Sequence, residues 1–123
     1  MVDEITKFTR IVLSNGTTKL TYAPGNFTPD QSGTIFYQSI HSIGTTEESV
    51  TAFGDIGDGS EGQIIIQNLD AANYVQVGFA TGVYGIRLTA NNPDAQFNAE
   101  PSVSLFLKAN TSACNVLITC LEV

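Results

Sequence analysis

Residues 73–80 read Asn-Tyr-Val-Gln-Val-Gly-Phe-Ala, and this stretch decides the class of fold. Its apolar side chains occupy every second position, at Val75, Val77 and Phe79. Because successive side chains of a strand point to opposite faces of a sheet, this alternation predicts a β-strand with one buried and one solvated face. One-sided burial is typical of antiparallel sheets.

Strand patterns extend outward from this stretch in both directions. We expect further strands over Ile5–Leu13, Thr17–Tyr22, Thr34–Ser42, Ser49–Phe53, Gln63–Leu69, Tyr84–Ala90, Val103–Ala109 and Asn115–Val123. Turn residues recur roughly every eight to twelve residues, and no stretch longer than about eight residues has helical periodicity. The sequence therefore predicts an all-β fold, an antiparallel two-sheet β-sandwich for which a jelly roll is one arrangement.

The two terminal strands depart from simple alternation. Asn115–Val123 is apolar on both faces, which predicts a central position in a sheet or a second face that another subunit covers. Ile5–Leu13 has apolar residues on mixed faces, which predicts a bulge or pairing with a neighbouring chain. We expect residues 1–123 to form a single β-sandwich domain, with residues 1–10 as a candidate interface arm.

Composition argues against several classes of partner. The chain has 123 residues, 14% of them charged, and a formal net charge of −7. Its five basic residues are scattered, so we expect no nucleic acid and no anionic membrane as partner. The first residues, Met-Val-Asp-Glu, do not have the pattern of a signal peptide, and we therefore expect synthesis in a cytoplasm.

The two cysteines, Cys114 and Cys120, fall six residues apart in one expected strand. That spacing corresponds to about 20 Å along a straight strand, whereas a disulfide requires Cα atoms within roughly 7 Å. We expect both to be reduced and buried thiols.

Residues suited to catalysis are few. The sole histidine, His41, lies in an expected strand with no nucleophile placed beside it, so we expect a half-exposed strand histidine. The acidic residues Asp55, Asp58 and Glu61 fall in a glycine-rich turn, where carboxylates are solvated. We predict no catalytic residues, no cofactor, no metal and no enzyme; whether this acidic turn binds a cation stays open.

Several motifs occur in a fixed order: an Asn-Gly turn at Asn15, Gly44–Val50 (Gly-Thr-Thr-Glu-Glu-Ser-Val), Asn68–Val75 (Asn-Leu-Asp-Ala-Ala-Asn-Tyr-Val) and Lys108–Ala113. Their order and spacing resemble a family of small structural proteins of tailed bacteriophages, over most of the chain. The resemblance implies a virion component that is assembled in the host cytoplasm. Within the second block, we expect Asp70 and Asn73 to hydrogen-bond local backbone and fix a hairpin register.

These observations lead to one main hypothesis, a capsid decoration or cement protein, trimeric, that binds and stabilises the major capsid protein shell. The candidate interface residues are Val2, Ile5, Phe8, Leu121 and Val123. A neck, tail or fibre subunit of the same particle is an alternative. An alternative of another class is a carbohydrate-binding host-attachment module, with Tyr22, Tyr37, Tyr74 and Tyr84 as candidate contacts.

Overall fold

The computed structural model describes residues 5–31, 34–57 and 59–122. The chain forms two compact units, residues 1–32 and residues 33–123. The part of the chain that the structure describes has no helix long and apolar enough to cross a membrane.

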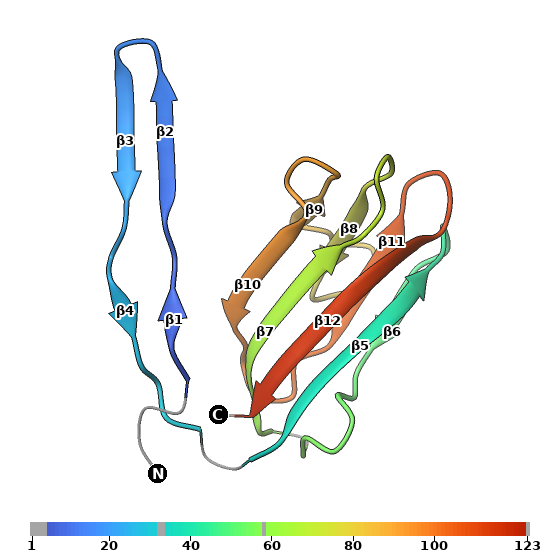
Figure 1. Ribbon diagram of the computed structural model, residues 1–123. Helices are drawn as coiled ribbons and strands as arrows, with labels where there is room; N and C mark the ends of the chain where they lie inside the picture. Colours follow the sequence, from blue (N-terminus) through green and yellow to red (C-terminus); the bar gives the residue numbers. More distant parts are fainter. Residues whose placement is uncertain (1–4, 32–33, 58, 123) are drawn as a thin grey trace. The chain divides into compact units, whose positions relative to one another are not determined.

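The second unit is a sandwich of two four-stranded antiparallel sheets (Figure 1). One sheet has the order β10-β7-β12-β5, and the other has the order β6-β11-β8-β9. The strands are β5 (Phe36–Ile43), β6 (Glu48–Val50), β7 (Glu61–Asn68), β8 (Val75–Gly78), β9 (Ile86–Leu88), β10 (Asp94–Asn98), β11 (Leu105–Ala109) and β12 (Cys114–Glu122). The predicted all-β, antiparallel two-sheet sandwich is confirmed.

The strands follow one another in jelly-roll order. The chain passes to the opposite sheet at every connection from β5 to β12 except the one between β8 and β9. As a result, the first and last strands of the sandwich, β5 and β12, lie side by side. This is the eight-stranded jelly roll that the sequence left as one arrangement of the sandwich.

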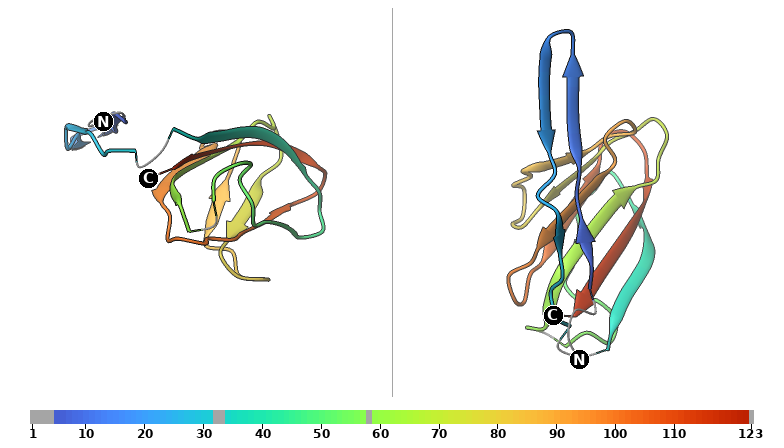
Figure 2. Two further views of the ribbon diagram at one scale, coloured as in Figure 1. Left: turned by 90° about the horizontal axis from the view of Figure 1, so that it is seen from below. Right: turned by 60° about the vertical axis from the view of Figure 1, so that its left-hand side comes forward.

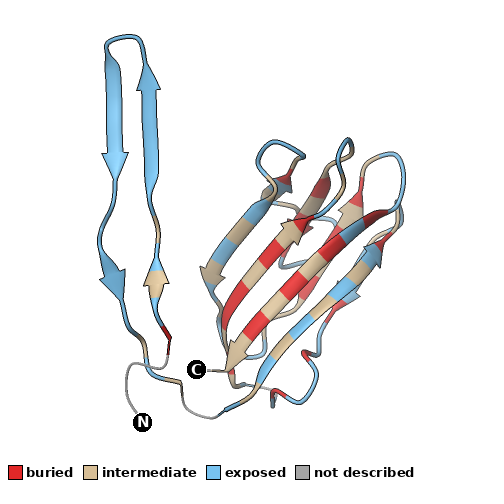
Figure 3. Ribbon diagram, in the orientation of Figure 1, coloured by how far each residue is buried: buried red, intermediate tan, exposed pale blue. Residues whose placement is uncertain are grey.

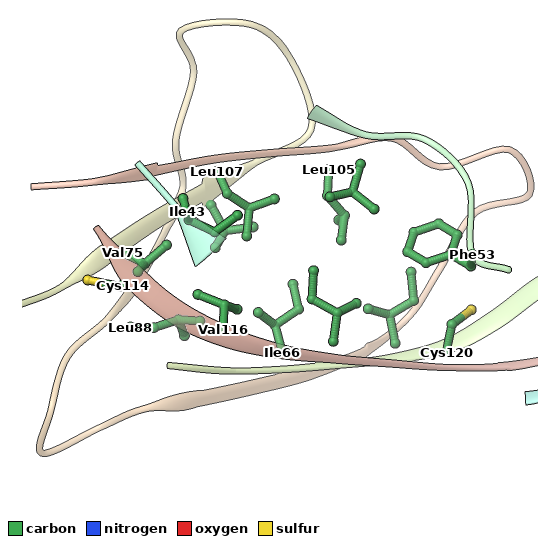
Figure 4. Packing of buried hydrophobic residues seen from close by; sticks show 14 of the residues in the cluster. Ile43, Phe53, Ile66, Val75, Leu88, Leu105, Leu107, Cys114, Val116 and Cys120 are labelled. Carbon is green, nitrogen blue, oxygen red and sulfur yellow. The ribbon is translucent and has the colours of Figure 1, made fainter. Parts of the chain in front are cut away.

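The core fills the space between the two sheets, and Figure 4 shows its side chains meeting there. Ile64 and Ile66 from β7 and Val116 and Ile118 from β12 have no exposed surface. β12 lies between β5 and β7, as its two apolar faces predicted. Both cysteines are free and buried in this core, which confirms that they do not form a disulfide.

The corner after β7 is held by side chains that bond to the backbone. Asn68 is buried, donates through Nδ2 to the carbonyls of Asn73 (2.9 Å) and Leu88 (2.9 Å), and accepts from the Asp70 amide (2.9 Å). Asp70 Oδ1 accepts from the amides of Ala72 (2.8 Å) and Asn73 (2.6 Å). The predicted local role of Asp70 is therefore confirmed.

Two expectations for this corner, the bonding of Asn73 and the presence of a hairpin, are wrong. The side chain of Asn73 does not bond local backbone. Its Nδ2 donates to Ser112 Oγ (2.9 Å), and its Oδ1 accepts from Thr111 Oγ1 (2.7 Å). The strands on either side, β7 and β8, belong to different sheets, so the corner connects the sheets and is not a hairpin. A sequence pattern shows that a turn occurs but not which sheet receives the next strand.

One sandwich strand escapes the sequence pattern. β10 has only Ala95 and Phe97 as apolar residues, and it lies at the edge of its sheet, paired with β7 alone. An edge strand of this kind carries little hydrophobic signal because it contributes few side chains to the core.

The first unit is a long two-stranded hairpin, seen from two further sides in Figure 2. β1 (Lys7–Phe8) pairs with β4 (Asn26–Phe27), and β2 (Ile11–Asn15) pairs with β3 (Thr18–Tyr22). These strands pair only with each other, in two-stranded sheets outside the two sheets of the sandwich. The expected strand over residues 5–13 is interrupted at residues 9–10, and the first unit extends to residue 32, beyond the expected arm of residues 1–10.

The turn of this hairpin differs by one residue from the predicted one. Asn15 pairs with Thr18, so the loop consists of Gly16 and Thr17, with Gly16 at a φ of 59°. Glycine at the first loop position, with positive φ, favours the tight hairpin turns whose twist matches the strands. The sequence predicted a loop centred on Asn15 and Gly16, and this shift decides which side chains share a face.

Candidate assembly interface

One face of the hairpin β2–β3 is apolar. Ile11 lies opposite Tyr22 and Leu13 lies opposite Leu20 in the antiparallel register, and residues two apart in a strand share a face. The exposed fractions of these side chains are 60% for Ile11, 44% for Leu13, 59% for Leu20 and 53% for Tyr22. These four residues are called the apolar hairpin face below.

The opposite face of the hairpin is mainly polar. Val12 lies opposite Thr21, and Ser14 lies opposite Lys19, whose Nζ donates to Ser14 Oγ at 2.9 Å. The hairpin therefore has the two-faced pattern of a strand pair that packs against something on one side. Figure 3 shows nonetheless that β2, β3 and β4 are exposed along their whole length.

An isolated two-stranded hairpin is at best marginally stable in water. Fully burying a large aliphatic or aromatic side chain stabilises a protein by about 1.5–3 kcal/mol. Since the apolar hairpin face is about half exposed, covering its four side chains would contribute on the order of 3–6 kcal/mol. Cover over this face would therefore stabilise the hairpin appreciably.

The base of the hairpin adds two exposed aromatic rings. Lys7 lies opposite Phe27 and Phe8 lies opposite Asn26, so the rings of Phe8 and Phe27 leave opposite faces of the strand pair. Their exposed fractions are 63% and 55%. A partner that covers either face of the hairpin therefore meets a phenylalanine at its base.

The sandwich has an exposed apolar surface of its own. On the outer side of the sheet β10-β7-β12-β5, Phe36 lies opposite Leu121 and Ile40 lies opposite Leu117, with Ile65 in the row between them. Phe36 is 68% exposed and Ile40 is 59% exposed, while the other three side chains are half-buried. These five residues are called the outer apolar patch below.

The two units differ in charge. Residues 1–32 carry three basic side chains, Lys7, Arg10 and Lys19, and three acidic ones, Asp3, Glu4 and Asp30. Residues 33–123 carry two basic and nine acidic side chains. All of the excess negative charge of the chain therefore belongs to the sandwich, while the three basic side chains of the first unit lie within residues 7–27, which contain no acidic residue.

The predicted interface residues occupy unlike places. Val2 and Val123 lie outside the described residues. Ile5 is buried and donates its amide to the Pro29 carbonyl (3.3 Å), and Phe8 is exposed. Leu121 is half-buried and belongs to the outer apolar patch. Their role in an interface stays a prediction.

The apolar hairpin face was not predicted from the sequence, because both strands were assigned to the sandwich. The mixed apolar pattern of residues 5–13 was the available signal: it fits a strand pair that no sheet of the same chain completes. Leu13 and Leu20 in particular meet only when the turn is placed at Gly16 and Thr17.

The sole histidine has a structural partner. His41 Nε2 and the Tyr37 hydroxyl lie 2.7 Å apart on the inner side of β5, where His41 is half-buried, as expected. In the sheet, His41 lies opposite Val116, while the cysteines lie opposite Ile43 and Tyr37. Burial raises the pKa of the Cys120 thiol to about 11, which keeps it protonated and unreactive.

The acidic turn before β7 serves the backbone. The expectation that its carboxylates are solvated is wrong for Glu61, which is 5% exposed and whose Oε2 accepts from the amides of Gly59 (2.9 Å) and Ser102 (3.1 Å). It thereby joins the loop before β7 to the loop before β11, where Ser102 has a positive φ of 63°. Asp58 lies outside the described residues, and among those described no three His, Cys, Asp or Glu side chains are grouped to hold a metal ion.

The candidate sugar-binding tyrosines are dispersed. Tyr84 donates to Glu47 Oε1 at 2.5 Å, and this bond lowers the pKa of Glu47 and raises the pKa of Tyr84. The Tyr74 ring lies 4.2 Å beneath the Arg87 guanidinium, and Tyr37 packs edge-on against Phe53. Tyr22 belongs to the first unit, whereas the other three tyrosines belong to the sandwich, where each has a different contact.

An open groove of about 360 Å³ lies at one end of the sandwich, between Phe79, Phe97 and Val103. The two phenylalanine rings meet edge to face with centroids 5.5 Å apart. Its wall is mainly carbon, so it suits an apolar side chain better than a polar ligand.

No known protein family matches the chain, and comparisons with curated proteins and with solved structures give no match either. Its function must therefore be inferred from its own surfaces.

Proposed function

We propose that the chain is a non-catalytic structural subunit of a bacteriophage virion that assembles through its N-terminal hairpin. In its simplest form it is a homotrimeric decoration protein that binds and stabilises the major capsid protein shell at the capsid surface. The observation that carries the proposal is the apolar hairpin face: four large side chains, 44–60% exposed, on a hairpin that pairs only with itself. A surface of this kind marks a site of protein association.

Two further features support a structural role. The jelly roll recurs in viral capsid proteins, although a fold alone does not determine a function. Glu61, the buried carboxylate before β7, is engaged in holding backbone, because it accepts from the amides of Gly59 and Ser102. The placement in a phage particle itself rests on the resemblance of the sequence motifs to small phage structural proteins.

The test is to count the chain in purified phage particles by quantitative mass spectrometry. Hundreds of copies per particle are expected for a capsid decoration protein. A count near that of a single ring, about six to twelve, would assign it to the neck or tail instead. Particles that lack the chain altogether would overturn the proposal.

A variant pair tests whether the hairpin mediates incorporation. Leu13→Asp places a charge on the apolar hairpin face, whereas Ser14→Asp places the same charge on the polar face one residue away. We expect Leu13→Asp chains to be lost from particles and Ser14→Asp chains to be retained. Equal incorporation of both variants would show that this face is not used.

A further inference from the structure

We propose that the apolar hairpin face docks on the outer apolar patch of a second copy of the chain. This inference rests on the proposed function, because both require a partner over the hairpin, and it goes further by naming the partner and both surfaces. Each copy then offers one hairpin and one patch, so the contact is head-to-tail and can close into a ring.

The apolar hairpin face and the outer apolar patch are both apolar strand faces, and their lengths are compatible. Each is an unpartnered face of antiparallel strands, and such faces pack as layers about 10 Å apart. The outer apolar patch extends along β5 from Phe36 to Ile40, roughly 13 Å at strand spacing. The two rows of the hairpin face, Ile11 with Tyr22 and Leu13 with Leu20, lie roughly 7 Å apart and fit within that length.

Charge favours a second copy as the occupant. Residues 7–27, which form the hairpin, carry three basic side chains and no acidic one, although the first unit as a whole is neutral; the sandwich carries two basic and nine acidic side chains. Opposite charge balances draw a hairpin toward the sandwich of another copy and disfavour contact between two sandwiches. Asp94 belongs to the same row as Ile40 and Leu117, so the patch has a carboxylate at its border.

The first experiment measures the mass of the full chain by sedimentation velocity and light scattering over a range of concentrations. We expect an oligomer for the wild type. Leu13→Asp on the hairpin and Ile40→Asp on the patch should each weaken association tenfold or more, because each brings a charge into an apolar contact. The controls Ser14→Asp, on the polar face of the hairpin, and Ser49→Asp, at an exposed position of β6 in the other sheet, should associate like the wild type.

Mixing the two disruptive variants separates a head-to-tail contact from others. A Leu13→Asp chain keeps an intact patch and an Ile40→Asp chain keeps an intact hairpin, so the mixture has one working junction. We expect a complex of two chains from the mixture and monomers from each variant alone. If only one of the two variants dissociates, the hairpin packs on another hairpin or the patch on another patch. That result, or a mixture that restores no complex, would show that the inference is wrong.

Thermal melting of the sandwich is the control for misfolding of the variants. The melting temperatures of both variants should match that of the wild type, because Leu13 and Ile40 are exposed. Should either variant fail to fold, Ile11→Asp and Phe36→Asp test the same two surfaces.

A second measurement uses Leu13→Cys and Ile40→Cys chains with a bismaleimide of about 10 Å, the spacing of packed sheets. Cross-linking between the two kinds of chain is expected, and its absence would contradict the docking.

The outcomes also separate this inference from the proposed function. A wild-type chain that stays monomeric at all concentrations, yet enters phage particles through its hairpin, overturns the second-copy contact and leaves the structural role standing. A chain that assembles by the hairpin and patch but is absent from particles supports the contact and overturns the virion role.

Discussion

The hairpin and the sandwich use similar strands to opposite effect. In the sandwich, each apolar face meets another, so Ile66 on β7 has no exposed surface. In the hairpin, the apolar face formed by Ile11, Leu13, Leu20 and Tyr22 is about half exposed. Since the sequence patterns are of the same kind, the difference lies in what the chain supplies as cover. The sandwich buries its apolar faces within one unit, whereas the strands of the hairpin leave theirs exposed, which is the basis of the proposed contact with a partner.

The largest expected effect comes from the tightest point of the sandwich. A Cβ at Gly78 would lie 1.8 Å from the Val83 carbonyl oxygen, so Gly78→Ala should lower the free energy of unfolding by about 3 kcal/mol or more. Gly85→Ala is the control, because nothing lies within 4 Å of its Cβ position. Chemical denaturation checks both; equal stability of the two variants would contradict the close approach of β8 and the residues before β9.

The same substitution, Ile→Ala, in the sandwich and in the hairpin tests the difference in burial between the two units. Ile66→Ala removes a fully buried side chain and should lower the free energy of unfolding by about 2–5 kcal/mol. Ile11→Ala removes a side chain that is 60% exposed and should change the unfolding of the monomeric sandwich by less than about 0.5 kcal/mol. Urea unfolding at low concentration measures both. A large loss in Ile11→Ala would mean that the hairpin is part of the same core.

A smaller effect is expected at Glu61, which joins two loops of the sandwich. Glu61→Ala leaves the amides of Gly59 and Ser102 without their acceptor, and should lower the free energy of unfolding by about 1–3 kcal/mol. Glu61→Gln keeps one carbonyl oxygen in place and should lose less. Thermal melting of the two variants checks the order, and equal melting points would show that these bonds add nothing.

The smallest expected effect is a loss of stability at low pH. Hydrogen bonds from Tyr84 and Gly82 lower the pKa of Glu47 below 4.5, and bonds from Asn73 and Ala72 lower that of Asp70 below 3.8. A carboxyl whose folded-state pKa is lowered stabilises the fold above its unfolded value, and this contribution is lost as pH falls through the folded value. Asp70→Asn should therefore lose less stability than the wild type below about pH 4. Melting points between pH 7 and pH 3 provide the check, and parallel curves would contradict it.

The sequence predicts the sandwich well because alternation reports directly on one-sided burial. Val75 and Val77 are buried as expected, and β12 lies between two strands as its two apolar faces indicated. β10 was missed because an edge strand with two apolar residues leaves little trace. The place of β7 and β8 in different sheets also escaped prediction, since local residues specify a turn and not the sheet that follows it.

The candidate interface was only partly predictable. Alternation marks the apolar face of a strand, but it does not show whether the covering surface belongs to the same chain. The register of the hairpin also depends on whether the turn is centred on Asn15 or on Gly16 and Thr17, and a shift of one residue would separate Leu13 from Leu20. Of the predicted positions, Phe8 is exposed and Leu121 is half-buried. The four residues of the apolar hairpin face could be identified as one surface only from the register that the structure shows.

The most direct test of the hairpin as an assembly surface is amide hydrogen exchange of the full chain as a function of concentration. We predict fast exchange of the β2–β3 amides in dilute solution and marked protection once the chain assembles, while the β12 amides stay protected throughout. Protection of β2–β3 equal to that of β12 in a dilute monomer would show that the hairpin is stable without a partner, and the proposed role of its apolar face would be wrong.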